Sequence, residues 1–183
     1  FGPVTLSDGT TATLNKIGIQ TFLGTPVLYP GDFSGVNLGA KINTAIASLT
    51  SSGGVIDARG FVGAQAITST ITVDKPVLLF LGAVTITGSV SNWFTVTSML
   101  IVEGQGKAQT FLTQSLLTGT VFNIASTSSF ILRDLRIDSA SAQTAGAYVA
   151  LTGTGGNANT HSIIEYCLFQ SQWIGIDMGQ TAA

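Results

Sequence analysis

Four short apolar segments decide the fold that this sequence predicts: Trp93-Phe94-Thr95-Val96, Val121-Phe122-Asn123-Ile124, Tyr148-Val149-Ala150-Leu151 and Ile174-Gly175-Ile176-Asp177. Their first residues lie 28, 27 and 26 positions apart. Each segment is too short for a core helix and is bounded by Gly, Ser, Thr or Asn, which is typical of strands. A period of this length indicates a repeat architecture, because no unit buries its apolar face alone and stacking builds the common core.

Two further series of strand-like segments alternate with the first one along the chain. One series comprises residues 78–81, 100–103, 130–133 and 162–165, and a looser one comprises residues 83–86, 110–113, 135–138 and 167–170. Three interleaved series predict a coil with three parallel faces and about five turns. Residues 139–146 and 153–160 fall between strands of different series, so we expect them to bulge outward as loops.

Residues 38–49 are the region with clear helical periodicity. Their apolar members share one face of a helix: Leu38, Ile42, Ala45, Ile46 and Leu49. The opposite face is expected to be polar, with Lys41, Asn43, Thr44 and Ser48. Asn37 is the predicted N-cap and Gly53 follows the helix after a polar turn. We expect the helix to cover the N-terminal end of a coil spanning residues 34–183, after an arm at residues 1–33.

The composition excludes several classes of function. The 183 residues carry a net charge of -2, and 9% of them are charged, with no cluster of Lys and Arg, so a nucleic-acid partner is not expected. No apolar run approaches the roughly 18 residues of a membrane span. The single Cys167 cannot form a disulfide within the chain. The loop Gly104-Gln105-Gly106-Lys107 lacks the spacing of a phosphate-binding loop, and we predict neither a cofactor nor a metal site.

The segment Gly54-Val55-Ile56-Asp57-Ala58-Arg59-Gly60, between the predicted helix and residues 67–77, carries a family resemblance. In this order the three elements resemble the N-terminal start of right-handed parallel β-helices of the pectate-lyase-like superfamily, which includes phage tailspikes. The resemblance covers about residues 35–178. It implies an all-β fold, a right-handed parallel β-helix of a single chain with an N-terminal capping helix. It also implies a carbohydrate-directed role outside the cell or on a virion surface.

The acidic residues of the coil supply weak catalytic candidates, namely Asp134, Asp138, Glu165 and Asp177. Glycoside hydrolysis requires two carboxyl groups on either side of the scissile bond, one of them protonated. The paired Asp, the Gly-His-Gly and the Arg-x-Lys that related hydrolases carry are missing, and His161 is the one histidine. We therefore expect the catalytic residues to be absent or to lie beyond this segment, and whether the protein is an enzyme stays open.

A charged column supplies the candidate binding residues. Glu103, Arg133 and Glu165 occupy the same position in successive segments, so they are expected to stack outward on neighbouring turns. The column is either a stabilising ladder of alternating charges or a saccharide-binding row in which Arg133 holds carboxylates or hydroxyls. Trp173, beside polar residues, is predicted to be the best exposed platform for stacking on a sugar ring.

The sequence thus favours a carbohydrate-directed module that binds or depolymerises polysaccharide. The alternative is a non-catalytic structural or adhesive solenoid. Ice binding is a third interpretation, based on Thr-x-Thr pairs that we do not expect to stack from turn to turn. Nothing after Asp177 resembles a cap, so we expect further turns beyond Ala183 or a covering chain in a homo-oligomer, a trimer if the tailspike resemblance holds.

Overall fold

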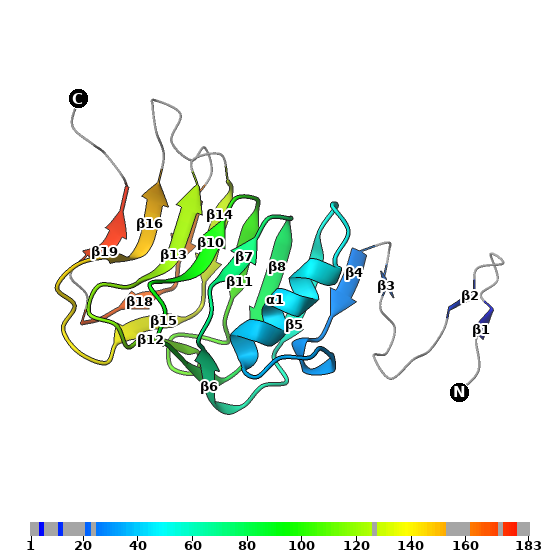
Figure 1. Ribbon diagram of the computed structural model, residues 1–183, viewed down its shortest axis with the longest axis horizontal. Helices are drawn as coiled ribbons and strands as arrows, with labels where there is room; N and C mark the ends of the chain where they lie inside the picture. The colour runs from blue at the N-terminus through cyan, green and yellow to red at the C-terminus, as the bar shows by residue number, and fades with distance from the viewer. Residues whose placement is uncertain are drawn as a thin grey trace.

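A computed structural model describes residues 4–5, 11–12, 21–22, 25–125, 128–152, 162–171 and 174–178. Its strands coil into a solenoid of three sheets (Figure 1). Sheet 1 contains β3 (Thr21–Phe22), β4 (Thr25–Leu28), β5 (Gly54–Ala58), β8 (Val77–Leu81), β11 (Leu100–Glu103), β14 (Phe130–Arg133) and β17 (Ser162–Glu165). Sheet 2 contains β6 (Gly63–Ile67), β9 (Val84–Gly88), β12 (Phe111–Gln114), β15 (Arg136–Ser139) and β18 (Leu168–Phe169). Sheet 3 contains β7 (Ile71–Val73), β10 (Asn92–Val96), β13 (Thr120–Ala125), β16 (Ala147–Thr152) and β19 (Ile174–Asp177).

The chain visits the three sheets in the same order in every turn. From β5 to β19 this order repeats five times, and every strand pairing within these turns is parallel. β4, inside the predicted arm, extends sheet 1 by pairing in parallel with β5, whereas β3 pairs with β4 and β1 (Val4–Thr5) pairs with β2 (Thr11–Ala12) in antiparallel fashion. The all-β parallel β-helix predicted from the repeats is confirmed. Its right-handed sense stays a prediction that the family resemblance implies.

Alternation of side chains builds the core along the inside of the coil. In β9, Val84 and Ile86 are buried while Thr85 and Thr87 are exposed, as a strand with one buried face requires. Inward residues of successive turns stack on one another. The rings of Phe94 and Phe122 are stacked with their centroids 4.9 Å apart. Each turn therefore buries its apolar side against the same position of its neighbours.

The register corrects two alignments made from the sequence. Phe94, Phe122, Val149 and Ile176 pair in one column, so the repeats in sheet 3 are 28, 27 and 27 residues long. The predicted alignment of Ile174 with Tyr148 was wrong by one residue, since Ile176 takes the inward position that Val149 holds one turn earlier. A shift by one residue would turn every side chain of the strand to the opposite face.

The second correction concerns the start of sheet 2. Thr85 pairs with Phe111, so Val84 rather than Ala83 corresponds to Thr110. Ala83 is exposed and precedes the strand, after Gly82. A Cβ on Gly82 would lie 2.6 Å from the Arg59 carbonyl oxygen, so the chain approaches the previous turn closely at this position. Ala83 therefore belongs to the tight bend, although the alignment of segments 83–86 and 110–113 assigned it to the strand.

The helix α1 (Leu38–Ser48) covers the N-terminal turn, as predicted (Figure 1). Its apolar face is buried against the first strands, β5, β6 and β7. Asn37 is the N-cap, and its side chain accepts a hydrogen bond of 3.0 Å from the Ala40 amide. Leu49, assigned to the helix from its periodicity, is the C-cap residue and is buried.

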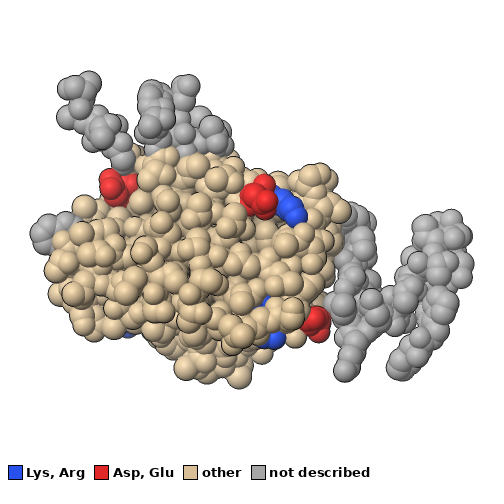
Figure 2. All heavy atoms as spheres, viewed as in Figure 1, with Lys and Arg blue, Asp and Glu red and all other residues tan. Residues whose placement is uncertain are grey.

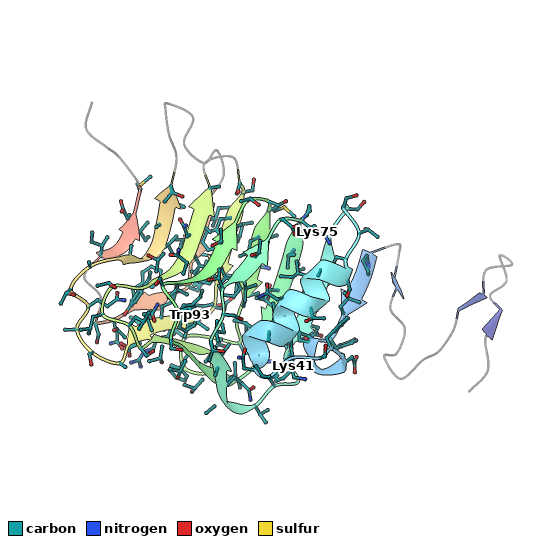
Figure 3. The ribbon with its side chains drawn as sticks, in the orientation of Figure 1. Lys41, Lys75 and Trp93 are labelled. Carbon is teal, nitrogen blue, oxygen red and sulfur yellow. The ribbon has the colours of Figure 1, made fainter. Side chains whose placement is uncertain are left out.

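Polar side chains complete this cap (Figure 3). The Lys75 ammonium donates to the carbonyl oxygens of Ile46, Ala47 and Leu49 at 3.2, 3.0 and 2.7 Å, which satisfies the C-terminal end of α1. Asn43, predicted to lie on the polar face of the helix, contacts the edge of sheet 3. Its amide accepts from the Thr72 backbone N–H at 2.9 Å and donates to the Thr70 carbonyl at 2.7 Å.

Asn43 thus supplies the partners that β7 lacks as the first strand of sheet 3. Helical periodicity separates polar from apolar positions, but it does not show that a polar side chain faces the edge of a sheet. Among the described residues, no helix is long and apolar enough to cross a membrane.

Replacing Ile46 by Asp should destabilise the fold by about 3 to 5 kcal/mol, because it buries a charge without a partner beneath the cap. Ala47 is exposed on the same helix, so Ala47→Asp is the matched control and should cost far less. Chemical unfolding monitored by circular dichroism measures both. An equal loss of stability in the two variants would contradict burial of this helix face.

Replacing Lys75 by Met should cost about 1 kcal/mol, because it removes the cation that satisfies three carbonyls at the C-terminus of α1. Lys107→Met, at an exposed loop position, is the control for loss of a positive charge. Urea unfolding compares the two variants. A wild-type free energy of unfolding in Lys75→Met would show that the helix end needs no such partner.

Candidate functional site

The outer face of sheet 1 carries a row of charged and aromatic side chains, which we call the charged row. Its members occupy one register position in five successive turns: Asp57, Phe80, Glu103, Arg133 and Glu165. The stacking predicted for Glu103, Arg133 and Glu165 is therefore confirmed. The neighbouring residues Val102 and Leu132 are fully buried, so the row points outward.

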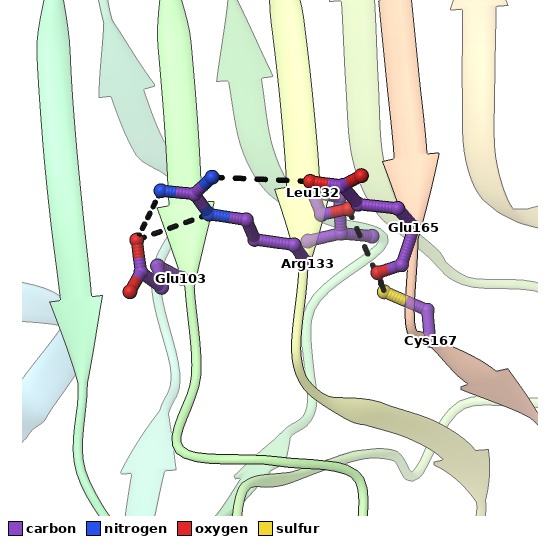
Figure 4. A network of polar contacts seen from close by, with 5 residues as sticks. All are labelled: Glu103, Leu132, Arg133, Glu165 and Cys167. Atoms are coloured by element: carbon purple, nitrogen blue, oxygen red, sulfur yellow. Dashed lines mark hydrogen bonds and ion pairs between the residues drawn. The ribbon is translucent and has the colours of Figure 1, made fainter.

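Arg133 is held between the two glutamates (Figure 4). Its Nε and NH2 groups donate to Oε2 of Glu103 at 3.0 and 2.6 Å, and its NH1 lies 3.8 Å from Oε1 of Glu165. The hydrogen bond and the charge of Glu103 raise the pKa of Arg133 above its usual range. The guanidinium is thus directed along the row, which favours the ladder interpretation over a free binding group.

Arg59, directly after β5, contacts two members of the row at its N-terminal end. The guanidinium of Arg59 donates to both carboxylate oxygens of Asp57, at 2.9 and 2.7 Å, and its Cζ lies 4.9 Å from the ring centroid of Phe80. The hydrogen bond from Arg59 is the main reason why the pKa of Asp57 lies below its usual value. Arg59 therefore combines an ion pair to Asp57 with a cation–π contact to the ring of Phe80.

A second polar cluster lies on the outer face of sheet 2, around Phe111, Arg136 and Asp138. Phe111 and Arg136 pair across adjacent turns, and Arg136 Cζ lies 5.4 Å from the ring centroid of Phe111. Arg136 NH2 also donates to Oδ2 of Asp138. The Ser139 amide donates to Oδ1 of Asp138 at 2.8 Å. The cluster joins a ring, a cation and a carboxylate on one surface.

The environment of Asp138 keeps this carboxylate ionised. Burial raises its pKa, but hydrogen bonds from the Arg136 side chain, the Ser139 backbone and the Ser171 side chain outweigh it, so that the pKa lies below its usual value. A general acid in glycoside hydrolysis needs a raised pKa. Asp138 therefore has the opposite of the property that an acid catalyst requires.

The four carboxylates considered as catalytic candidates do not share one surface. Asp138 lies in sheet 2, Glu165 in sheet 1 and Asp177 in sheet 3. Asp134 lies between β14 and β15 with a φ of 59°, at the corner between sheets 1 and 2. The structure thus places Asp138, Glu165 and Asp177 on three different sheets. Asp134 is a neighbour of Glu165 on the adjacent turn, where its backbone amide donates to the Glu165 carbonyl oxygen at 3.4 Å.

Sequence reasoning missed Phe111 and Arg136 as members of a site. A signal existed, because both residues hold the second position in the aligned segments 110–113 and 135–138. Trp173, the predicted stacking platform, and His161 lie outside the described residues.

Cys167 has the surroundings of a structural thiol. Burial is the main cause that raises its pKa to about 11. Its Sγ lies 3.3 Å from the Glu165 carbonyl oxygen and 3.6 Å from that of Leu132 (Figure 4). The thiol therefore stays protonated at neutral pH, unlike a reactive cysteine. Within the described part of the chain, no group of three or more His, Cys, Asp or Glu residues is placed to hold a metal ion.

The comparisons with known proteins leave the fold as the basis of classification. No protein-family model matches the chain, and no curated protein or solved structure matches it significantly. The five turns of three parallel sheets define the class, a parallel β-helix protein with an N-terminal helical cap.

Replacing the two carboxylates whose pKa values are lowered should make the stability of the fold less sensitive to acid. Because the folded-state pKa values of Asp57 and Asp138 lie below their unfolded values of about 3.9, their stabilisation is present above about pH 4 and is lost as the pH falls through the folded values. The double variant Asp57→Asn/Asp138→Asn should melt lower at neutral pH and lose less stability on acidification. Asp74→Asn, at an exposed position, is the control, and an unchanged acid profile in the double variant would contradict the linkage.

Proposed function

We propose that this β-helix binds carbohydrate without cleaving it, as a module of an extracellular or virion-surface protein. The observation that carries this proposal is the cluster of Phe111, Arg136 and Asp138 on the outer face of sheet 2. A sugar presents apolar C–H groups that pack on an aromatic ring and hydroxyls that bind to charged groups. The cluster offers both kinds of partner within adjacent turns.

Hydroxyl-bearing side chains extend this surface. Thr85 precedes Phe111 and Arg136 in one register column, and Thr87 and Thr113 precede Asp138 in the other. In each of the two columns, threonine lies in the earlier turns and a charged residue lies in β15. An extended saccharide lying along the coil would meet the same two columns at every turn. The spacing of neighbouring strands, about 4.8 Å, sets the repeat of such a surface.

Binding without cleavage is favoured over depolymerisation. The four carboxylate candidates lie on three sheets and a corner, and hydrogen bonds lower the pKa of Asp138. The likeness of the N-terminal segments to the pectate-lyase-like superfamily supports a carbohydrate ligand, and membership of that superfamily is part of this proposal. Self-association of the chain is also part of this proposal.

The second candidate is a structural or adhesive solenoid, favoured by one observation. Figure 2 shows few charged atoms over the face formed by α1 and sheet 3. One outward column of this sheet contains Thr72, Thr95, Asn123 and Ala150 and ends on one charged residue, Asp177. A regular polar surface with so few charges suits contact with another large surface. Thr95 faces Asn123 and Thr85 faces Phe111, so the Thr-x-Thr pairs do not form the continuous array that ice binding requires.

Glycan-array screening of the whole chain, followed by calorimetric titration of the best ligand, tests the proposal. Arg136→Ala should weaken binding about tenfold or more, because it removes a charged hydrogen-bond donor. Arg133→Ala, in the charged row of sheet 1, is the matched control and should leave the affinity unchanged. Thermal melts establish that both variants are folded.

Two results would locate the saccharide on the coil, and a third would decide between the two candidate functions. Loss of affinity in Arg136→Ala alone supports the sheet 2 surface. Loss in Arg133→Ala alone moves the saccharide to the charged row. If no glycan binds to the wild-type chain, the carbohydrate proposal fails and the structural alternative is favoured.

A further inference from the structure

The outer face of sheet 1 carries an aliphatic row beside the charged row. Its members share one register position in six successive strands: Val27, Val55, Leu78, Ile101, Ile131 and Ile163. They are partly exposed and, in every strand but β17, alternate with buried inward positions, and Ile163 is 50% exposed. Parallel sheets are normally covered on both faces. A continuous aliphatic row on an outer face therefore indicates a contact surface.

The adjacent charged row alternates in sign along the coil. Asp57 is negative, the guanidinium of Arg59 lies over Phe80 at the second turn, and Glu103, Arg133 and Glu165 follow at the third, fourth and fifth. Reading along the axis, the signs are negative, positive, negative, positive and negative. Such a row is complementary to itself when it is shifted by one turn.

We propose that the outer face of sheet 1 is a docking surface for a second copy of this chain. The two copies form an isologous dimer whose two-fold axis lies in the interface and runs parallel to the strands. This symmetry sets the coils antiparallel and places the aliphatic row on the aliphatic row and the charged row on the charged row. The axis passes between two turns, so that each charge faces one of opposite sign.

The alternation of charge excludes the other in-plane axis. A two-fold axis along the coil would keep the coils parallel and set each turn opposite its own copy. Over the charged row, such an axis would place Arg133 opposite Arg133; between the two rows, it would place the charged side chains against aliphatic ones. Like charges in direct opposition are destabilising. The charged row therefore selects the antiparallel arrangement, and the aliphatic row supplies the apolar area that drives association.

A second copy fits this face better than other occupants. A partner of uniform charge would meet attraction and repulsion in turn along the row. Arg59 and Arg133 already form ion pairs with acids of the same chain. A partner is therefore attracted to this row only if its own charges alternate in the opposite order. The sheet 2 cluster lies on another face, so this inference is independent of carbohydrate binding.

Sedimentation velocity over a dilution series tests the dimer. The wild-type chain should shift from monomer to dimer with concentration, and Ile131→Asp should raise the dissociation constant at least about tenfold. Thr95→Asp, at a comparable outward position of sheet 3, is the control and should dimerise as the wild type does. Circular dichroism checks that each variant is folded. A wild-type chain that stays monomeric throughout, or an Ile131→Asp variant that dimerises normally, would overturn the proposal.

Cysteine cross-linking in a Cys167→Ser background tests the geometry and does not depend on a disruptive substitution. Because the axis passes between turns, each aliphatic side chain faces one of a different turn. A mixture of Leu78→Cys and Ile101→Cys chains, or of Ile101→Cys and Ile131→Cys chains, should form disulfide-linked dimers in one of the two combinations. Each single-cysteine chain alone should cross-link much less. Equal cross-linking of the single variants, or none in both mixtures, would refute the antiparallel register.

Discussion

The structure depends on one constraint, the in-register parallel pairing of each strand with the equivalent strand of the next turn. The pairing holds neighbouring turns about one strand spacing apart, so a side chain always meets the side chain at the same position one turn away. Most inward positions are therefore apolar, as the stack of Phe94 on Phe122 illustrates, and a buried polar side chain such as Gln114 forms hydrogen bonds to the backbone. A local change of chain length is absorbed in the corners, and the inward column stays aligned even where the repeat changes from 28 to 27 residues.

The same constraint creates a problem at the ends of the coil, where strands lose their partners. At the N-terminal end, α1 covers the core with its apolar face, and Asn43 and Lys75 satisfy polar groups of the edge strand and of the helix itself. At the last turn the apolar residues Ile174, Ile176 and Met178 are 40%, 42% and 63% exposed. The two ends of the described coil thus differ in how completely side chains of this chain cover them.

Stacking also shapes the chemistry that the outer faces can support. Residues at the same position of successive turns form a row on one face. Rows of charged or aromatic side chains are suited to extended or repetitive partners. Catalysis by two carboxylates requires convergence on one bond, and here the candidate acids are spread over three sheets. The two arginine clusters, around Arg133 and Arg136, are instead built from residues of adjacent turns.

The sequence by itself determined the repeat, the three-faced coil, the capping helix and the stacking of Glu103, Arg133 and Glu165. These features follow from periodicity, which records the alternation of buried and exposed positions. Only the tertiary structure decided the register of β9 and β19, the role of Asn43 at the edge of β7 and the contact of Arg136 with Phe111. Each of these depends on how much chain the corners consume, and a one-residue difference there changes which side chains meet across turns.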